Sequence, residues 1–442
     1  MIFYDSAMKR RRPDLRIRSQ DPLPIRLSRW LGLAVAVAAA SPSPISAQFI
    51  GPDATARGVT VFNRPRPDFD PLGVRLPGYR LDASLEGGVG YDDNLLPGQG
   101  PRRSGAFAEE ALSVAGTSTW TRHGIEATAT QLTRQHVRDS DLNWNDYAIG
   151  VVGRYDIGRA SWLRLRYEHI RSHLDVDDLD VQQSGTRTPA PYDTDVVYAA
   201  GSVAFNQLRV GASLDYRWLR YQDVTVAGVR DQLSNNDHQA VLGEFNAEYG
   251  FLPGRALLGV VRLQDISYDR AGQSGRDSFT WEIQGGAQYD VDGLWQGRLL
   301  LGYRRRDYEQ AGLKPLSGPA FEGQVILTPS QLATVTVAVQ RSIEESIRQD
   351  SVSYTLTSAR ATLDYEVLRN VIVTVGTRVE RREYPDDVGT VTDAIGLLEA
   401  RWMLNRSMTL VGTFQHTERL SAPSGIQEYG RNQVMLRLRF AL

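Results

Sequence analysis

Arginine and glutamate side chains recur at alternate positions in several segments of this chain. Alternate residues of a β-strand point to the same face, so this spacing places a row of charges along one wall. Guanidinium groups donate forked hydrogen bonds to carboxylates, phosphates and hydroxyls, which suits the passage of an anionic or hydroxyl-rich molecule. The alternative, which we favour for any single residue, is that Arg and Glu pair across strands and only stiffen the wall. The residues predicted to line a passage are Arg164, Arg166, Arg209, Arg217, Glu282, Arg298, Arg304, Arg306, Arg378, Arg382, Arg437 and Arg439.

The same sequence contains few of the motifs that indicate a catalytic site. No G-x-S-x-G, H-E-x-x-H or P-loop sequence occurs, and the absence of cysteine excludes thiolate metal sites and disulfides. His169 and His173 share a strand phase but lack a clear third metal ligand. The acidic run Asp175–Asp180 lacks the spacing of an EF-hand, so we expect a solvated loop rather than a cation site. We therefore expect no enzyme, no metal and no cofactor.

The clearest strand pattern lies between Phe279 and Arg306. One face of this segment is apolar or small at every second residue, and the alternate face is mostly polar. A period of two is typical of β-strands, and Asp292-Gly293 between the two runs is a hairpin turn signal. The apolar face is bracketed by aromatic residues, as the lipid-facing wall of a membrane barrel requires. These residues are Trp281 and Tyr303 at one end of the hairpin and Tyr289 and Trp295 at the other.

The hairpin also predicts a strand register. A turn centred on Gly293 places Glu282 opposite Arg304 and Tyr289 opposite Gly297. The polar face then carries paired charges of opposite sign, and the apolar face carries an aromatic ring over a glycine.

Similar alternation predicts about 18 strands, in which short connections alternate with longer, polar ones. Stacked soluble sheets are the alternative, but a sandwich gives no reason for aromatic residues to be sorted by turn length. Short turns facing the periplasm and longer loops facing outward are typical of outer-membrane barrels. The expected strands are Tyr79–Tyr91, Gly105–Trp120, Gly124–His136, Asn143–Ile157, Ser161–Leu174, Asp193–Asn206, Leu208–Gln222, Asp237–Phe251, Ala256–Arg270, Gly275–Val291, Trp295–Tyr308, Pro319–Leu327, Ala333–Glu345, Asp350–Val367, Val371–Tyr384, Thr390–Leu404, Met408–Leu420 and Gly430–Leu442.

The chain divides into three parts by composition. Residues 1–47 have the pattern of a signal peptide with a long basic leader, because arginines precede the apolar run Trp30–Ala40 and small residues precede Gln48. Residues 48–78 form a Pro-rich periplasmic arm, expected to be extended, exposed and unpaired, and either to lie in the periplasm and contact a partner or to enter and plug the mouth of the barrel. Residues 79–442 form the barrel, and the mean hydropathy of −0.34 excludes a bundle of membrane helices. The arm residues predicted to contact a partner are Arg64, Arg66, Phe69 and Arg75.

The arm and the first strand contain two short motifs, Arg64-Pro65-Arg66-Pro67-Asp68-Phe69-Asp70-Pro71-Leu72-Gly73-Val74-Arg75 and Tyr91-Asp92-Asp93-Asn94. The stretch that carries them, Val59–Leu96, resembles the start of the putative β-barrel porin 2 family of Gram-negative bacteria. The resemblance implies an outer-membrane component associated with exopolysaccharide synthesis and export genes. It transfers no functional residue to this chain.

We therefore expect an all-β protein, a single transmembrane antiparallel β-barrel of the Gram-negative outer membrane, reached through the periplasm. The expected function is a conduit for exopolysaccharide export. The partners would be outer-membrane lipid and lipopolysaccharide, the barrel-assembly machinery, a periplasmic polysaccharide-export protein and the polysaccharide cargo, with no nucleic acid. The alternative is a general diffusion porin for small hydrophilic solutes. A trimeric assembly and an inward-folded constriction loop would favour this alternative, and the longest candidate loop is Asp175–Tyr192.

Overall fold

The computed structural model describes residues 59–158, 160–183, 187–226, 229–291, 293–348, 351–385 and 389–442. The expected signal peptide, the first residues of the expected arm and Asp292 of the expected turn lie outside the described residues. Within them, no helix is long and apolar enough to cross a membrane.

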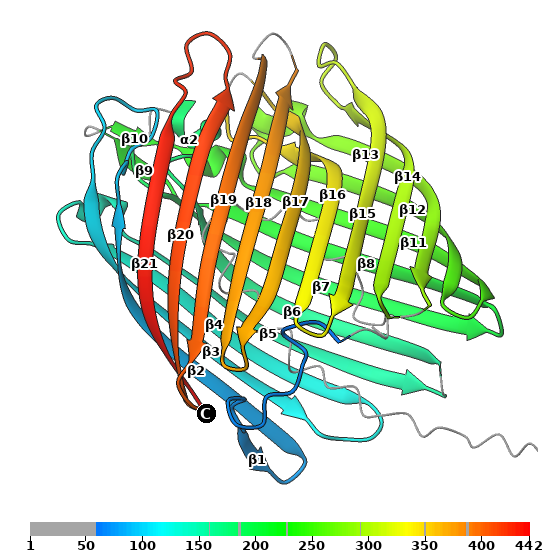
Figure 1. Ribbon diagram of the computed structural model, residues 1–442. Helices are drawn as coiled ribbons and strands as arrows, with labels where there is room; N and C mark the ends of the chain where they lie inside the picture. The colour runs from blue at the N-terminus through cyan, green and yellow to red at the C-terminus, as the bar shows by residue number, and fades with distance from the viewer. Residues whose placement is uncertain are drawn as a thin grey trace, which may run out of the picture.

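The wall is a closed antiparallel barrel of 18 strands (Figure 1). Consecutive wall strands pair with each other, and the last strand returns to the first, where Leu85 lies opposite Phe440. Closure satisfies the backbone donors and acceptors that an open sheet edge would leave exposed to lipid. The expected fold class is confirmed.

The wall strands are β2 (Tyr79–Asp92), β3 (Gly105–Ser118), β4 (Gly124–His136), β5 (Trp144–Ile157), β6 (Ser161–Leu174), β7 (Ala190–Phe205), β8 (Leu208–Tyr221), β11 (His238–Leu252), β12 (Arg255–Tyr268), β13 (Ser278–Asp290), β14 (Trp295–Tyr308), β15 (Leu316–Ser330), β16 (Ala333–Glu345), β17 (Ser353–Leu368), β18 (Val371–Tyr384), β19 (Gly389–Met403), β20 (Met408–Ser421) and β21 (Gly430–Ala441). The other elements are the short strand β1 (Val74–Leu76), the hairpin of β9 (Val224–Val226) and β10 (Val229–Asp231), the helix α2 (Leu179–Gln183), and the 3-10 turns Ser140–Leu142, Leu233–Asn236 and Ala271–Arg276.

Alternation along the strands separates an apolar outer surface from a polar interior. Outward side chains such as Leu257, Ile283 and Leu301 are 55%, 55% and 56% exposed, which in a membrane means contact with lipid. Inward side chains such as Glu282 and Arg306 are only 4% and 1% exposed, because they pack against one another inside the barrel. The hydrophobic surface therefore faces outward, the reverse of a soluble protein.

The predicted hairpin is formed by β13 and β14 with the predicted register. Glu282 lies opposite Arg304, and Tyr289 lies opposite Gly297. At the turn, the rings of Tyr289 and Trp295 stack with 3.8 Å between their centroids. The register prediction is confirmed.

The two ends of the barrel differ in their connections. Two-residue turns such as Asn206-Gln207 and Arg369-Asn370 close one end, whereas residues 93–104 and 269–277 form longer connections at the other. The short-turn end is the periplasmic end in this class of barrel. In Figure 1, β1 and the C-terminus lie at the lower, periplasmic end, and α2 lies at the upper, outer end.

The described part of the arm departs from the expectation that it is unpaired. Strand β1 pairs with the start of β2, with Leu76 opposite Tyr79. This hairpin is possible because Gly78, in the two-residue turn between β1 and β2, adopts a positive φ angle of 80°, which lets the chain reverse its direction. Proline content correctly indicated a non-strand path further upstream, but it gave no signal for this reversal.

Candidate functional site

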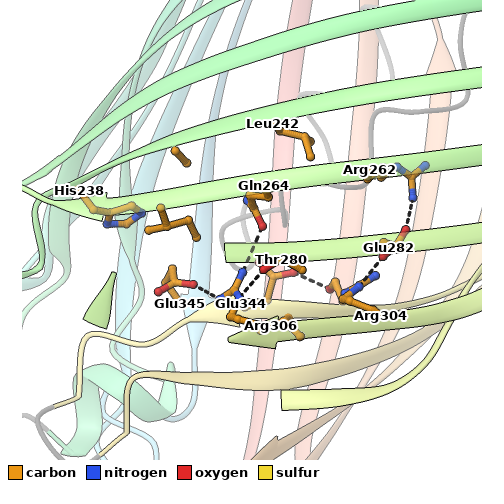
Figure 2. Close-up of a pocket in the computed structure, with 14 residues that line it drawn as sticks. His238, Leu242, Arg262, Gln264, Thr280, Glu282, Arg304, Arg306, Glu344 and Glu345 are labelled. Carbon is orange, nitrogen blue, oxygen red and sulfur yellow. Dashed lines mark hydrogen bonds and ion pairs between the residues drawn. The ribbon is translucent and has the colours of Figure 1, made fainter. Parts of the chain in front are cut away.

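The inner wall carries an alternating network of charges centred on Arg262 of β12. Arg262 Nε donates to Glu244 Oε2 at 2.7 Å, and its Nη1 donates to Glu282 Oε1 at 2.7 Å. Arg262 Nη2 lies 3.2 Å from Glu322 Oε2. Glu282 also accepts a hydrogen bond from Arg304 Nε (Figure 2). Each buried charge is therefore balanced by neighbours on nearby strands, which is the condition for burying charges without large cost.

The predicted passage residues lie on the inward phase of their strands. On β6, for example, Leu163 and Leu165 are exposed on the outer surface, so Arg164 and Arg166 between and beyond them point inward. The structure groups most of these residues in ion pairs rather than leaving them open. Their role in solute passage stays a prediction.

The ion pairs of the predicted residues differ in their N–O distances, and they lie on separate parts of the wall. On β13 and β14, Glu282 and Arg304 belong to the network just described. The other ion pairs are Arg306 with Glu345, Arg298 with Glu322, Arg217 with Asp215, Arg166 with Glu168 and Asp215, Arg378 with Glu380, Arg382 with Glu380, Asp393 and Asp178, Arg437 with Glu86, Glu109 and Glu399, and Arg439 with Glu86. Arg164 lies 5.1 Å from the Trp162 ring centroid, and Arg209 lies opposite Glu248 in register.

Sequence reasoning missed Arg262. The inward residues Leu258 and Val260 of β12 are as apolar as the outward Leu257 and Val261, so hydropathy alone does not reveal which face is which. Register would have found it, because Arg262 lies directly opposite Glu282, an inward residue that the sequence did predict.

The segment Asp175–Gln183, hereafter the constriction loop, enters the outer end of the barrel from β6 and reaches the opposite wall. Asp177 Oδ2 lies 3.1 Å from Arg431 Nη1 of β21, and Tyr384 of β18 donates to Asp180 Oδ1 at 2.9 Å. Arg419 of β20 donates to Gln182 Oε1 at 2.7 Å. These contacts join residues more than 200 positions apart in the sequence.

Apolar residues of the constriction loop fix its position. Leu179 is fully buried against Tyr384 and Val391. Val181 is fully buried in a cluster that includes Leu233. The expectation of a solvated loop is therefore wrong: aliphatic residues interleave with the aspartates, and the arginines of the opposite wall compensate the buried carboxylates. No group of three or more metal-ligating side chains in the described parts of the chain is arranged to hold a metal ion.

Burial changes the acidity of the constriction loop. It raises the pKa of Asp177 to about 6, and the Asp175 carboxylate adds to this shift. Burial also raises the pKa of Asp178 to about 7, although the Arg382 guanidinium opposes the shift. For Asp175, burial acts to raise the pKa, but the Arg431 guanidinium outweighs it and holds the pKa below its usual range. The docked loop thus holds protons near neutral pH.

The arm occupies the periplasmic end of the lumen. Arg64 Nη1 lies 2.9 Å from Glu366 Oε1, and Arg66 Nη2 lies 2.5 Å from Glu366 Oε2. Arg66 is only 3% exposed, so it does not present a free surface to a partner. Of the other predicted partner contacts, Phe69 is half-buried and Arg75 is exposed. Arg64 and Arg66 meet at Glu366, Phe69 N donates to the Arg66 carbonyl oxygen, and partner contact stays a prediction.

A closed barrel with an apolar outer surface, a charged lumen and an inward-folded loop defines an outer-membrane channel of the porin class. The chain belongs to the family Putative beta-barrel porin 2, whose sequence model matches residues 66–442. This confirms the resemblance found at Val59–Leu96, and membership points to the outer membrane as the location of the protein.

Other comparisons add little beyond the fold. No curated protein matches the chain. Among solved structures, it is similar to OpdK with vanillate from Pseudomonas aeruginosa at 13% identity, covering 82% of this chain and 98% of that chain with a TM-score of 0.44. It is also similar to OccK2 (OpdF) with glucuronate from Pseudomonas aeruginosa at 11% identity, with the same coverages and a TM-score of 0.44. These values are too low to bear on what this chain transports.

Proposed function

We propose that the protein is a passive outer-membrane channel for small hydrophilic solutes. The observation that carries the proposal is the constriction loop, which lies inside the barrel and is bound to the opposite wall through Arg382, Arg419 and Arg431. A loop held in this way narrows the outer end of the lumen. Small solutes need only the remaining space, whereas a polymer chain requires the loop to leave the lumen. No covalent chemistry is part of the proposal.

Passage through such a channel depends on many weak contacts rather than one tight site. Solute hydroxyls and charges exchange partners along the alternating arginine and carboxylate groups of the wall, such as Arg262, Glu282 and Arg304. Weak multi-site contact allows a solute both to enter and to leave, which conduction requires.

Exopolysaccharide export, which the sequence resemblance implied, is the second candidate. Its support is the association with exopolysaccharide export genes that the resemblance at Val59–Leu96 implied. For this function, the constriction loop must be displaced while the polymer passes, and the polymer would be supplied by a periplasmic export protein. Three expectations are the same for both candidate functions. These are synthesis with a signal peptide, assembly by the barrel-assembly machinery and contact with lipopolysaccharide.

Solute uptake into liposomes containing the purified full-length protein separates the two candidates. We expect arabinose to enter at a rate that rises with the amount of protein, and an oligosaccharide of ten or more sugars to be excluded. Entry of the oligosaccharide at a rate comparable with arabinose would reject the small-solute channel in favour of the polymer conduit.

A further inference from the structure

Two arginines face each other inside the barrel without an acid between them. Arg360 of β17 and Arg378 of β18 are direct register partners. Leu363 and Val375 on the alternate phase of the same strands are 40% and 50% exposed on the outer surface, so both arginines point inward. Arg378 lies midway along β18 (Val371–Tyr384), and the pair is therefore at mid-depth in the wall.

The register partners of this pair on the neighbouring strands are uncharged. The residue opposite Arg360 on β16 is Ala338, and the residue opposite Arg378 on β19 is Ile395. Four adjacent strands therefore contribute two cations and no carboxylate to this row. Like charges directly opposite each other destabilise a sheet, so the arrangement calls for a compensating anion.

The row of register partners through Arg262 shows how charges are compensated elsewhere in the wall. There, Glu244, Arg262, Glu282 and Arg304 are successive register partners on β11, β12, β13 and β14, with the sign alternating at every step. The wall can thus neutralise its charges within a row, which makes the row through Arg360 a distinct arrangement.

Side-chain contacts support the same distinction. Arg378 Nε lies 3.3 Å from Glu380 Oε1, a carboxylate that also interacts with Arg382 at 3.3 Å. Within the described ranges, Arg360 makes no hydrogen bond and no ion pair. The nearest carboxylate on its own face of β17, Asp364, interacts electrostatically with Arg360 without forming an ion pair with it, and accepts a hydrogen bond from Thr374 at 2.7 Å.

A second arginine pair in the wall is compensated differently. Arg154 of β5 lies opposite Arg164 of β6, also on the inward phase. Arg154 Nε donates to Asp156 Oδ1 at 2.8 Å, and the Arg164 guanidinium lies 5.1 Å from the Trp162 ring centroid. Both members of this pair therefore have a close side-chain contact, whereas Arg360 has an electrostatic interaction with Asp364 and no ion pair within the described residues.

We propose that Arg360 and Arg378 form a binding subsite for small solutes that carry an oxyanion, either a carboxylate or a phosphate. The proposal rests on the channel function above and names the solute class that the lumen favours. Each guanidinium donates to one oxygen of the anion as it passes mid-depth, and the anion supplies the negative charge that the row lacks. The interaction is exposed to lumen water, so it slows and concentrates the solute without trapping it.

The test is block of single-channel current in planar bilayers by succinate and by inorganic phosphate, in potassium chloride, for the wild-type protein, R360Q, R378Q and R381Q. Arg381 lies on the outward phase of β18 and pairs with Glu383, so R381Q controls for disturbance of that strand without altering the lumen. We expect R360Q and R378Q each to raise the half-blocking concentration about tenfold, and R381Q to leave it unchanged. Stronger block by phosphate than by succinate would assign the preference to phosphate, and the reverse to carboxylate.

Two results would overturn the subsite. One is a shift in reversal potential for R360Q with an unchanged half-blocking concentration, because this would reflect net lumen charge alone. The other is an equal effect of R381Q. If the wild-type protein conducts no current, the channel function fails, and the subsite is then decided by calorimetric titration of the detergent-folded barrel with succinate and phosphate. Heat of binding that R360Q abolishes supports the subsite, and no heat with either probe rejects it.

Discussion

Glu282 of β13 lies directly opposite Arg304 of β14 and accepts a hydrogen bond from its Nε, while its other oxygen accepts from Arg262 at 2.7 Å. One carboxylate thus joins three strands of the inner wall. Its side chain is only 5% exposed, and it shares the compensation of Arg262 with Glu244 and Glu322.

Replacing Glu282 should destabilise the barrel measurably. E282Q keeps the shape of the side chain but removes the charge, leaving two partly buried guanidiniums without their shared partner. Breaking a buried ion pair costs up to about 3–5 kcal/mol, and lumen water reduces this to about 1–3 kcal/mol. The heat-dependent shift in gel mobility should occur at a lower temperature, whereas E110Q, at an exposed position of β3, should behave as wild type. Equal transition temperatures for all three proteins would contradict the account.

Gly302 is required for β13 and β14 to approach each other. A Cβ atom added at Gly302 would lie 1.9 Å from the Ile283 carbonyl oxygen, a backbone atom that cannot move aside cheaply. We expect G302A to reduce the folded fraction, with a cost of at least about 1–3 kcal/mol. G259A on β12 is the matched control, because a Cβ there meets nothing within 4 Å. Assembly yield, measured as the heat-modifiable fraction, should fall for G302A alone, and equal yields would refute the steric argument.

The docked constriction loop should respond to pH. The pKa of Asp177 is raised to about 6 and that of Asp178 to about 7, above the ordinary value of 3.8. The docked loop therefore binds protons that a released loop would lose, and docking weakens as pH rises through these values. The lowered pKa of Asp175 has the opposite effect, because it strengthens docking as the pH rises. This effect is confined to pH values below about 4, where an ordinary aspartate titrates.

Mean conductance should accordingly be lower and steadier at pH 5 than at pH 8. The double variant D177N/D178N should lose most of this difference, because its side chains do not titrate. Hydrogen exchange of the loop amides at the two pH values, corrected for intrinsic rates, provides an independent measurement. Tighter docking at pH 8 would contradict the sign of the argument.

Local patterns predicted the wall well because lipid imposes a period of two on every strand. The segments Trp295–Tyr308, Ala333–Glu345 and Val371–Tyr384 were predicted with the bounds that the structure gives. Strand ends at the outer rim were less accurate, for example Pro319 against the observed start at Leu316, since the polar outer loops carry no such period.

The positions of the constriction loop and the arm inside the lumen could not be predicted in the same way. The constriction loop is held by Tyr384 and Arg431, whose proximity to Asp180 and Asp177 follows only from closure of the barrel. Likewise, Arg66 reaches Glu366 across 300 positions of sequence, so composition alone placed it in an exposed arm. Such contacts depend on tertiary geometry rather than on local propensity.

The most direct test of the central claim is the single-channel conductance of L179D beside wild type and Q183D. Leu179 is fully buried against Tyr384 and Val391, so a carboxylate there should release the constriction loop, whereas Gln183 is exposed at the end of the same helix. We predict a conductance at least twofold higher for L179D, with Q183D equal to wild type, in barrels of normal heat stability. Identical conductance for all three folded proteins would show that the loop does not set the width of the channel, and would contradict the account.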